Sequence, residues 1–302
     1  MRILFFSIAA LLYHDSTIAQ SASNINPTQV VLLGTGTPNP EPDRSGPSLA
    51  IIVNNHSYVV DCGPGVVRRA AEAADKNIPA LRSAGLTRLF ITHLHSDHTV
   101  GYPDFLLSPA VTGRDQALEI FGPKGLQNMT DHLLLAYKED KDIRINGLEK
   151  GHAQGYQVTV HEIQPGLVYT DSNITVKAFR VNHGSWPEAF GYRFETKDKV
   201  IVVSGDYTYS ENLIKNAKDC DILIHEVYSM EGLARREKQW QDYHSNFHTS
   251  TEQLAKIANI VHPTLLVLIH QLQFGTSKES LMKEITDRYK GLVIYGKDLD
   301  IF

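Results

Sequence analysis

One short stretch of the chain combines residue types that bind metal ions. His93, His95 and His98 lie with Asp97 inside six positions, directly after the apolar run 89–91. Three neighbouring imidazoles would repel one another if protonated, and an ionised aspartate is almost never buried without a partner. Neutral imidazole and carboxylate are natural ligands of a divalent cation. The stretch therefore predicts a metal site in a loop that follows a buried strand.

The spacing within this stretch indicates two ions. Residues two apart in an extended segment share a face, so His93 and His95 can reach one ion. Asp97 and His98 follow at the turn and can reach a second ion beside it. Because each ion needs further ligands, we expect metal-capable residues at other strand ends to complete the site. Three residues downstream follow apolar strand-like runs in this way: His183, Asp206 and His270.

Alternating and continuous apolar runs predict the elements that position these residues. Strands are expected at 29–33, 48–53, 57–60, 89–91, 118–121, 156–162, 174–181, 189–195, 199–204, 222–227 and 265–269. Helices are expected at 66–75, 98–107, 125–137, 211–218, 251–260 and 278–289. The order predicts an α+β fold in which sheets carry helices on their outer faces and the site lies at the strand ends. No repeat or Pro/Gly-rich linker interrupts the chain, so we expect a single domain.

Composition describes an ordinary soluble protein of 302 residues, with 42% hydrophobic and 21% charged residues. The net charge is -5 and no basic run is present, which disfavours tight binding to a polyanion. Only two cysteines occur, Cys62 and Cys220. Each adjoins a strand-like run, so we expect two buried free thiols in preference to a disulfide.

The first residues have the layout of a secretory signal peptide. Arg2 precedes the apolar run 3–12, and small residues follow at Ala19 and Ala22, where cleavage is expected. The predicted division is therefore a signal peptide at 1–22 and a hydrolase domain at 23–302, with a secreted or periplasmic product that has no membrane attachment after cleavage. A disordered or membrane-tethered start is the alternative. No other stretch resembles a membrane span.

The metal-capable residues together resemble the motifs of the metallo-β-lactamase superfamily, over about residues 28–295. That resemblance implies an αββα sandwich with a binuclear site between its sheets. It also implies two zinc-binding sets with a shared carboxylate: His93, His95 and His183 for the first ion; Asp97, His98 and His270 for the second; and Asp206 bridging both. Mn²⁺ and Fe remain alternatives to Zn²⁺ as the natural metal.

Within the superfamily the chain is most similar to ribonuclease Z and its relatives, at residues 32–38, 60–65, 204–206, 223–226 and 248–250. In that group, the glutamate of the Ile-His-Glu strand orients the histidine that protonates the leaving oxygen. Carried over, these residues are Glu226 and His248. A carboxylate behind an imidazole fixes its tautomer and raises its basicity, which agrees with such a role. His225 is expected on the opposite face of its strand.

Several features depart from the ribonuclease pattern. The Gly/Pro-rich basic arm that grips tRNA is absent, Gln271-Leu272-Gln273 follows His270, and Tyr207 stands where threonine is usual. These departures, together with export, make tRNA an unexpected substrate. Trp186, close to His183, fits either a pocket wall or the core.

We therefore expect an exported binuclear zinc hydrolase that cleaves a small-molecule ester, in the first place a phosphodiester. Two Zn²⁺ ions would lower the pKa of a bridging water, and the resulting hydroxide would attack the ester. Asp97 would also steer this nucleophile, and the Glu226/His248 pair would supply the acid. An arylsulfatase and then a lactonase are the alternatives, and a non-enzymatic metal-binding protein is the least favoured. A homodimer is compatible with the sequence.

Overall fold

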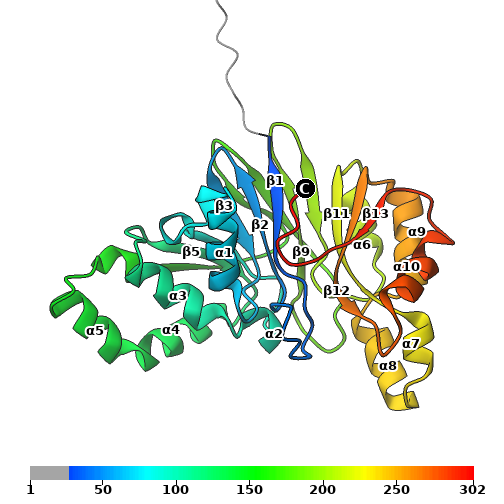
Figure 1. Ribbon diagram of the computed structural model, residues 1–302, viewed down its shortest axis with the longest axis horizontal. Coiled ribbons are helices and arrows are strands. Elements are labelled where there is room, and N and C mark those ends of the chain that lie inside the picture. Colours follow the sequence, from blue (N-terminus) through cyan, green and yellow to red (C-terminus); the bar gives the residue numbers. More distant parts are fainter. Residues whose placement is uncertain (1–26) are drawn as a thin grey trace, which may run out of the picture.

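Two β-sheets packed face to face form the centre of the protein, and helices cover both outer faces (Figure 1). The computed structural model describes residues 27–302, so the predicted signal peptide at 1–22 lies outside the described residues. The αββα arrangement expected from the sequence is confirmed. No helix in the described part combines the length and apolar character needed to cross a bilayer.

The first sheet has six strands in the order β1-β2-β3-β4-β5-β6. Its strands are β1 (Gln29–Gly34), β2 (Ser48–Val53), β3 (His56–Val60), β4 (Arg88–Phe90), β5 (Leu118–Gly122) and β6 (Val158–Glu162). The strands β1 to β3 pair antiparallel, whereas β3 to β6 pair parallel. The carboxyl ends of β3 and β4 therefore lie at the same edge of the sheet.

The second sheet has seven strands in the order β13-β12-β11-β10-β9-β8-β7 and repeats this plan. Its strands are β7 (Gly166–Thr170), β8 (Thr175–Arg180), β9 (Phe190–Glu195), β10 (Val200–Val203), β11 (Ile222–Tyr228), β12 (Leu265–Leu272) and β13 (Val293–Tyr295). An antiparallel part, β7 to β10, leads into a parallel part, β10 to β13. Each sheet thus contributes carboxyl-terminal strand ends to one region.

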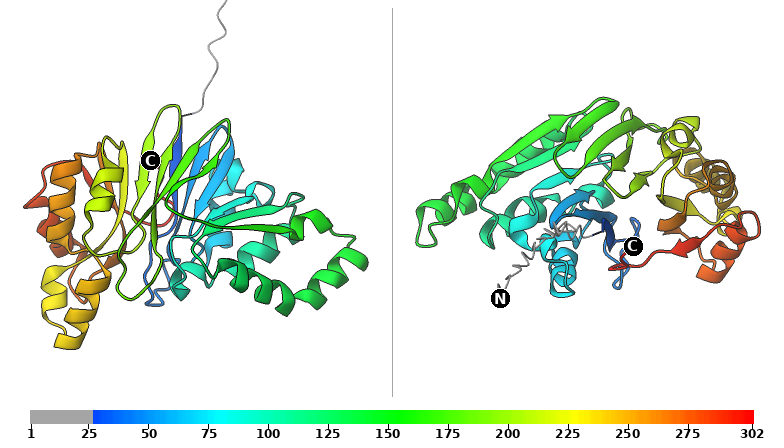
Figure 2. Two further views of the ribbon diagram at one scale, coloured as in Figure 1. Left: turned by 180° about the vertical axis from the view of Figure 1, so that it is seen from behind. Right: turned by 90° about the horizontal axis from the view of Figure 1, so that it is seen from above.

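The helices form the two outer layers. Those on the first sheet are α1 (Val66–Asp75), α3 (Tyr102–Val111) and α4 (Leu126–Ala136), and those on the second are α6 (Glu211–Ala217), α9 (Thr251–Val261) and α10 (Lys278–Thr286). Two parts project from opposite ends of the molecule: α5 (Lys138–Asn146) on one side, and the pair α7 (Met230–Ala234) and α8 (Lys238–Phe247) on the other (Figure 2). The short helix α2 (Ser96–Thr99) carries part of the metal-binding motif.

Three apolar layers follow from the alternation of side chains along the strands. In β1, Val30 and Leu32 face the core between the sheets, whereas Val31 and Leu33 face the helices of the first layer. Because both faces are covered, such strands are continuous apolar runs in the sequence, which made them easy to predict. Cys62 and Cys220 are both buried free thiols, as expected.

The helix expected at 98–107 is wrong as a single element. The chain forms α2 and α3 instead, separated at Gly101. A Cβ at Gly101 would lie 2.3 Å from the carbonyl oxygen of Gly63, while the Gly101 N–H donates to the oxygen of Cys62 at 2.9 Å. The close approach of these backbones fixes the break and holds α2 beside the end of β3. The elements β7, β13, α7 and α8 were not expected from the sequence.

Candidate metal centre

The seven predicted metal ligands come together at the strand ends where the two sheets meet. They lie in loops and short elements at this edge: His93 and His95 after β4, Asp97 and His98 on α2, His183 after β8, Asp206 after β10 and His270 in β12. His270 corrects the expected strand end at 269, because β12 continues to Leu272. The residue is the extra one of a bulge opposite Glu226 and Val227, with a φ of 45°, and the bulge turns its ring towards the site.

Three imidazole nitrogens converge in the first cluster. The Nδ1 atom of His95 lies 2.9 Å from Nε2 of His93 and 3.0 Å from Nε2 of His183. His183 Nδ1 donates to the carbonyl of Phe247 at 2.7 Å, and His93 Nδ1 faces the hydroxyl of Thr92 at 3.0 Å. That hydroxyl donates its own proton elsewhere, so it accepts from His93. Both Nε2 atoms therefore present lone pairs to the same point.

This donor set fits a cation better than it fits hydrogen bonding. A proton on His95 Nδ1 could satisfy one of the two facing lone pairs but not both. Three nitrogens bound tetrahedrally to zinc at about 2.0–2.1 Å lie roughly 3.3–3.4 Å apart, about 0.4 Å more than the two separations given above. Burial also lowers the pKa of His93 well below its usual value and that of His183 to about 3, which keeps both lone pairs free.

Carboxylates dominate the second cluster. Nε2 of His98 lies 3.3 Å from Oδ2 of Asp206 and 3.5 Å from Oδ2 of Asp97, and Nε2 of His270 lies 3.3 Å and 3.2 Å from the same two atoms. Burial disfavours a charged His98, but Asp206, Asp97 and Asp61 outweigh it and raise its pKa well above the usual value. The negative charge of these carboxylates would thus be stabilised by a positive charge at this point. A second divalent cation would supply it.

Asp61 supports both clusters, and the sequence interpretation did not assign it. Its carboxylate accepts from the Thr92 N–H at 2.7 Å, from the Thr92 hydroxyl at 2.8 Å and from His98 Nδ1 at 2.8 Å. Through these bonds Asp61 fixes the tautomer of His98. It also orients the Thr92 hydroxyl, which in turn fixes the tautomer of His93. Asp61 directly follows β3, so a search for strand-end aspartates upstream of the motif would have found it.

Glu226 and His248 form the pair that the sequence predicted. Oε2 of Glu226 lies 3.4 Å from Nδ1 of His248, and both side chains are buried. The other carboxylate oxygen accepts from the Thr249 N–H at 2.7 Å. Burial, followed by the charge of Asp206, raises the pKa of Glu226 well above its usual value, and burial lowers that of His248 to about 4. Oε2 of Glu226 and Nδ1 of His248 are both buried without a hydrogen-bond partner, so one proton placed between them would satisfy both atoms.

Three aromatic residues that lie close in sequence to the predicted ligands have different surroundings. Trp186 is a wall of the first cluster, since its ring lies 4.8 Å from that of His95 and its Nε1 faces His95 Nε2. Tyr207 is fully buried, with its hydroxyl 2.8 Å from Nε2 of His225, so it belongs to the core. His225 thus lies on the face opposite Glu226, as expected. Phe274 packs against His244, with their rings 4.5 Å apart.

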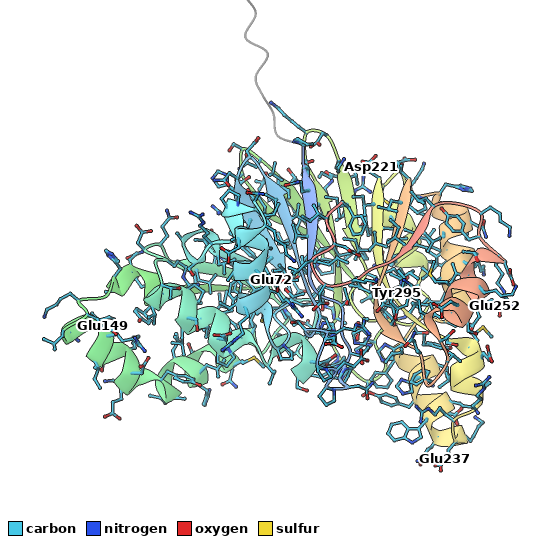
Figure 3. The ribbon with its side chains drawn as sticks, in the orientation of Figure 1. Glu72, Glu149, Asp221, Glu237, Glu252 and Tyr295 are labelled. Carbon is cyan, nitrogen blue, oxygen red and sulfur yellow. The ribbon has the colours of Figure 1, made fainter. Side chains whose placement is uncertain are left out.

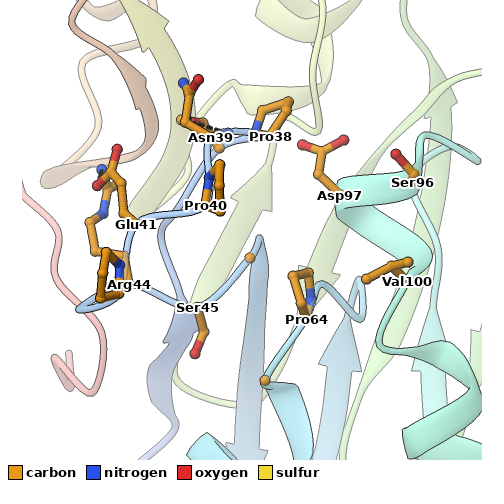
Figure 4. Close-up of a pocket in the computed structure, with 14 residues that line it drawn as sticks. Pro38, Asn39, Pro40, Glu41, Arg44, Ser45, Pro64, Ser96, Asp97 and Val100 are labelled. Carbon is orange, nitrogen blue, oxygen red and sulfur yellow. Dashed lines mark hydrogen bonds and ion pairs between the residues drawn. The ribbon is translucent and has the colours of Figure 1, made fainter.

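A pocket of about 530 Å³ opens on the Asp97 side of the centre (Figure 4). Its other wall is the proline-rich loop 37–46, and Figure 4 shows Asp97 opposite Pro38 and Asn39 across the space. Asp298 anchors this loop by accepting from the backbone N–H groups of Thr35 and Ser45 at 2.9 Å and 2.7 Å. The loop is thereby held beside the second cluster.

Comparison with known proteins gives the class to which this fold and site belong. The model of the family described as "Beta-lactamase superfamily domain" matches residues 56–271. The chain belongs to this superfamily and is a metal-dependent hydrolase of the metallo-β-lactamase fold.

Individual relatives within this superfamily are named ribonucleases and related proteins of the same fold. The chain is 30% identical over 279 residues to "Ribonuclease Z" of Mycobacterium bovis, which covers 90% of this chain and 96% of that protein. Two solved structures share the fold. The metallo-β-lactamase fold protein YhfI from Bacillus subtilis has a TM-score of 0.69 at 19% identity, covering 92% of this chain and 99% of that one. The short form of human tRNase Z has a TM-score of 0.66 at 23% identity, covering 91% and 98%. The relatives' names lean against the expected small-molecule ester.

Proposed function

We propose that this protein is a binuclear zinc phosphodiesterase. The observation that carries the proposal is the position of the Glu226–His248 pair directly against the second cluster. The rings of His248 and His270 are stacked 5.6 Å apart, and Nδ1 of His248 lies 3.9 Å from Oδ2 of Asp206. The ring of the proposed proton donor therefore lies directly against the second cluster, which suits a reaction that expels a basic oxygen.

Each residue has a defined role in this proposal. The two clusters would hold one zinc ion each, with Asp206 between them, and the ions would supply Lewis acidity and lower the pKa of water. Asp97 would orient the attacking water through its carboxylate. Nδ1 of His248 faces Glu226, which leaves Nε2 to give its proton to the departing oxygen. The wall formed by Trp186 would limit the entry of bulk water to the first cluster.

The substrate proposed is a small phosphodiester, although the ribonuclease names of the relatives favour RNA. The main projection of the first layer, α5, has three basic and three acidic side chains. Lys138 pairs with Asp142 at 2.5 Å, and Arg144 pairs with Asp140 and Glu149 at 3.0 Å. Charges neutralised in this way are poor contacts for a phosphate backbone.

The proposal also includes export and dimerisation, which do not follow from the geometry of the metal centre. The secreted or periplasmic location rests on the signal-like sequence at 1–22, and mass spectrometry of the mature N-terminus would test it. A homodimer stays a prediction that sedimentation would decide.

The function is tested by giving the zinc-loaded protein four substrates: bis(nitrophenyl) phosphate, a dialkyl phosphate diester, nitrophenyl sulfate and precursor tRNA. We expect hydrolysis of the diesters. His248→Ala should lower the rate by about 10²-fold or more on the alkyl diester, and by less on the nitrophenyl diester, because nitrophenolate leaves without a proton. His132→Ala, which removes an exposed histidine on α4, is the matched control.

Faster cleavage of the sulfate than of either diester would move the protein to the arylsulfatase branch. Efficient cleavage of precursor tRNA alone would overturn the small-substrate part of the proposal. If the protein held two zinc ions and hydrolysed no phosphodiester, the proposed function would be wrong.

A further inference from the structure

Helix α8 carries an aromatic stripe that the core does not use. Trp240, Tyr243, His244 and Phe247 follow one another at the spacing i, i+3, i+4, i+7, which places them on one face of the helix. Yet no residue of α8 is buried, and Trp240 and Tyr243 are 48% and 38% exposed to solvent. Figure 3 shows Glu237, directly before α8, at the outer tip of the molecule. A stripe of this kind usually packs into a core.

The inner end of the stripe lies against the metal centre. The ring of Phe247 is 5.1 Å from that of His183 and 6.5 Å from that of His95. The ring of Tyr243 stacks on Phe247 at 4.3 Å with an interplanar angle of 21°. Gly184 makes this approach feasible, because a Cβ there would lie 2.2 Å from the Phe247 ring. The stripe therefore continues outward from the first cluster as a stacked aromatic surface.

The same helix leads directly into the proton donor. His248 is the residue after α8, and its ring lies 5.6 Å from that of His244, one turn earlier. Burial and then the charges of Asp206 and Asp97 raise the pKa of Tyr243, which agrees with a phenol in the field of the metal-binding carboxylates. An oxygen held at the His248 ring would therefore lie beside the last turns of α8.

We infer that the stripe of α8 binds a flat aromatic ring carried by the leaving group of the substrate. This inference rests on the proposed function, which makes His248 the donor to the leaving oxygen. Phe247 adjoins His248 in the chain, Tyr243 stacks on Phe247, and Trp240 extends this aromatic surface outward. Aromatic surfaces bind flat rings through stacking, which aliphatic groups of the same size lack. The leaving-group side of the site therefore selects aromatic alcohols.

The chain permits a binding test that does not depend on catalysis, because it has only two tryptophans: Trp186 lies against His95, and Trp240 lies in the stripe. Trp186→Phe leaves Trp240 as the only tryptophan. The probe is methyl benzylphosphonate, in which a CH₂ group replaces the scissile oxygen, and methyl cyclohexylmethylphosphonate is its non-aromatic match. On zinc-loaded protein we expect saturable quenching of Trp240 fluorescence by the benzyl compound. The cyclohexyl compound should bind more weakly.

Substitutions on the stripe then locate the ring. Tyr243→Ala should weaken binding of the benzyl compound by about tenfold and lower its preference over the cyclohexyl compound, whereas Tyr243→Phe should keep both values. Tyr137→Ala is the matched control, because Tyr137 is similarly exposed, at 42%, but lies at the end of α4.

Equal affinity of the two phosphonates, or a benzyl affinity unchanged by Tyr243→Ala, would overturn the inference. It would also be overturned if Tyr243→Ala converted a dimer into a monomer without altering benzyl affinity, since the stripe would then be a contact between copies. The phosphonates are not hydrolysed, so this test remains decisive even if the protein cleaves no diester. In that case the proposed function alone would fail.

Discussion

Replacing Asp61 by asparagine removes a charge and one acceptor from the support of the metal centre, with almost no change in volume. The carboxylate accepts three hydrogen bonds: Oδ1 takes the Thr92 N–H, and Oδ2 takes the Thr92 hydroxyl and His98 Nδ1. An amide has one oxygen, so in either orientation at least one buried donor faces an NH₂ group. Hydrogen bonds to charged groups contribute about 1.5–3 kcal/mol, and an unsatisfied donor costs about 1–3 kcal/mol. We expect Asp61→Asn to lower the free energy of unfolding by about 2–4 kcal/mol.

The same substitution should weaken zinc binding, because His98 loses the partner that fixes its tautomer. Outer partners of this kind alter metal affinity by about 10–100-fold. Chelator competition with a zinc indicator measures that affinity, and urea unfolding of the metal-free protein measures stability. Asp171→Asn is the control: this carboxylate also accepts several bonds, including those from Tyr58 and Tyr169, but it lies in the β7–β8 turn. It should lower stability without changing zinc affinity. Wild-type zinc affinity in Asp61→Asn would refute the reasoning.

Two further predictions concern stability away from the clusters. Arg114 is fully buried and donates to the carbonyls of Leu86, Phe105, Leu106 and Gly155. Arg114→Met should therefore lower the free energy of unfolding, measured with urea, by at least about 3 kcal/mol and leave zinc stoichiometry unchanged. Burial lowers the pKa of His225 from 6.5 to about 4, so the unfolded chain binds more protons between these values and stability falls as pH decreases through that window. In metal-free His225→Gln this loss should be smaller by about 3 kcal/mol, as measured by urea unfolding at pH 7 and pH 4.

The metal centre was largely predictable because its residues obey a simple spatial rule. Buried parallel strands are continuous apolar runs, and their carboxyl ends meet at one edge, so metal-capable residues that follow such runs converge. Asp206, which follows the parallel strand β10, was located in this way, and His183 follows β8, an antiparallel strand whose carboxyl end lies at the same edge. His270 was located by the same rule, although the expected strand end at residue 269 is wrong, because β12 forms a bulge at His270 and continues to Leu272. Asp61 obeys the rule equally well and was missed because the search began downstream of the motif.

The pairing of Glu226 with His248 required more than spacing. Glu226 lies within a fully buried strand and His248 follows a helix, so neither position alone indicates chemistry. Only the resemblance to ribonuclease Z joined them, and the structure brings them to 3.4 Å. What the sequence pattern does indicate is a carboxylate inside an apolar run, a group that is rarely buried without a partner. That partner, 22 residues further along the chain, becomes apparent only when the second sheet is assembled.

The region before His248 could not be predicted, because helical spacing does not reveal what a helix face contacts. Trp240, Tyr243 and Phe247 have the periodicity of a core-facing stripe, and a core role would have been the natural interpretation. In the structure the core of the second layer is already filled by α6, α9 and α10. The aromatic face of α8 therefore has no apolar layer to join, and its inner end meets the metal-binding histidines instead. Exposed aromatic side chains next to the metal centre are available to contact a substrate. The wall on the Asp97 side is instead formed by a proline-rich loop. The two sides of the site are thus chemically distinct, so a diester should bind in one preferred orientation, with its aromatic alcohol towards α8.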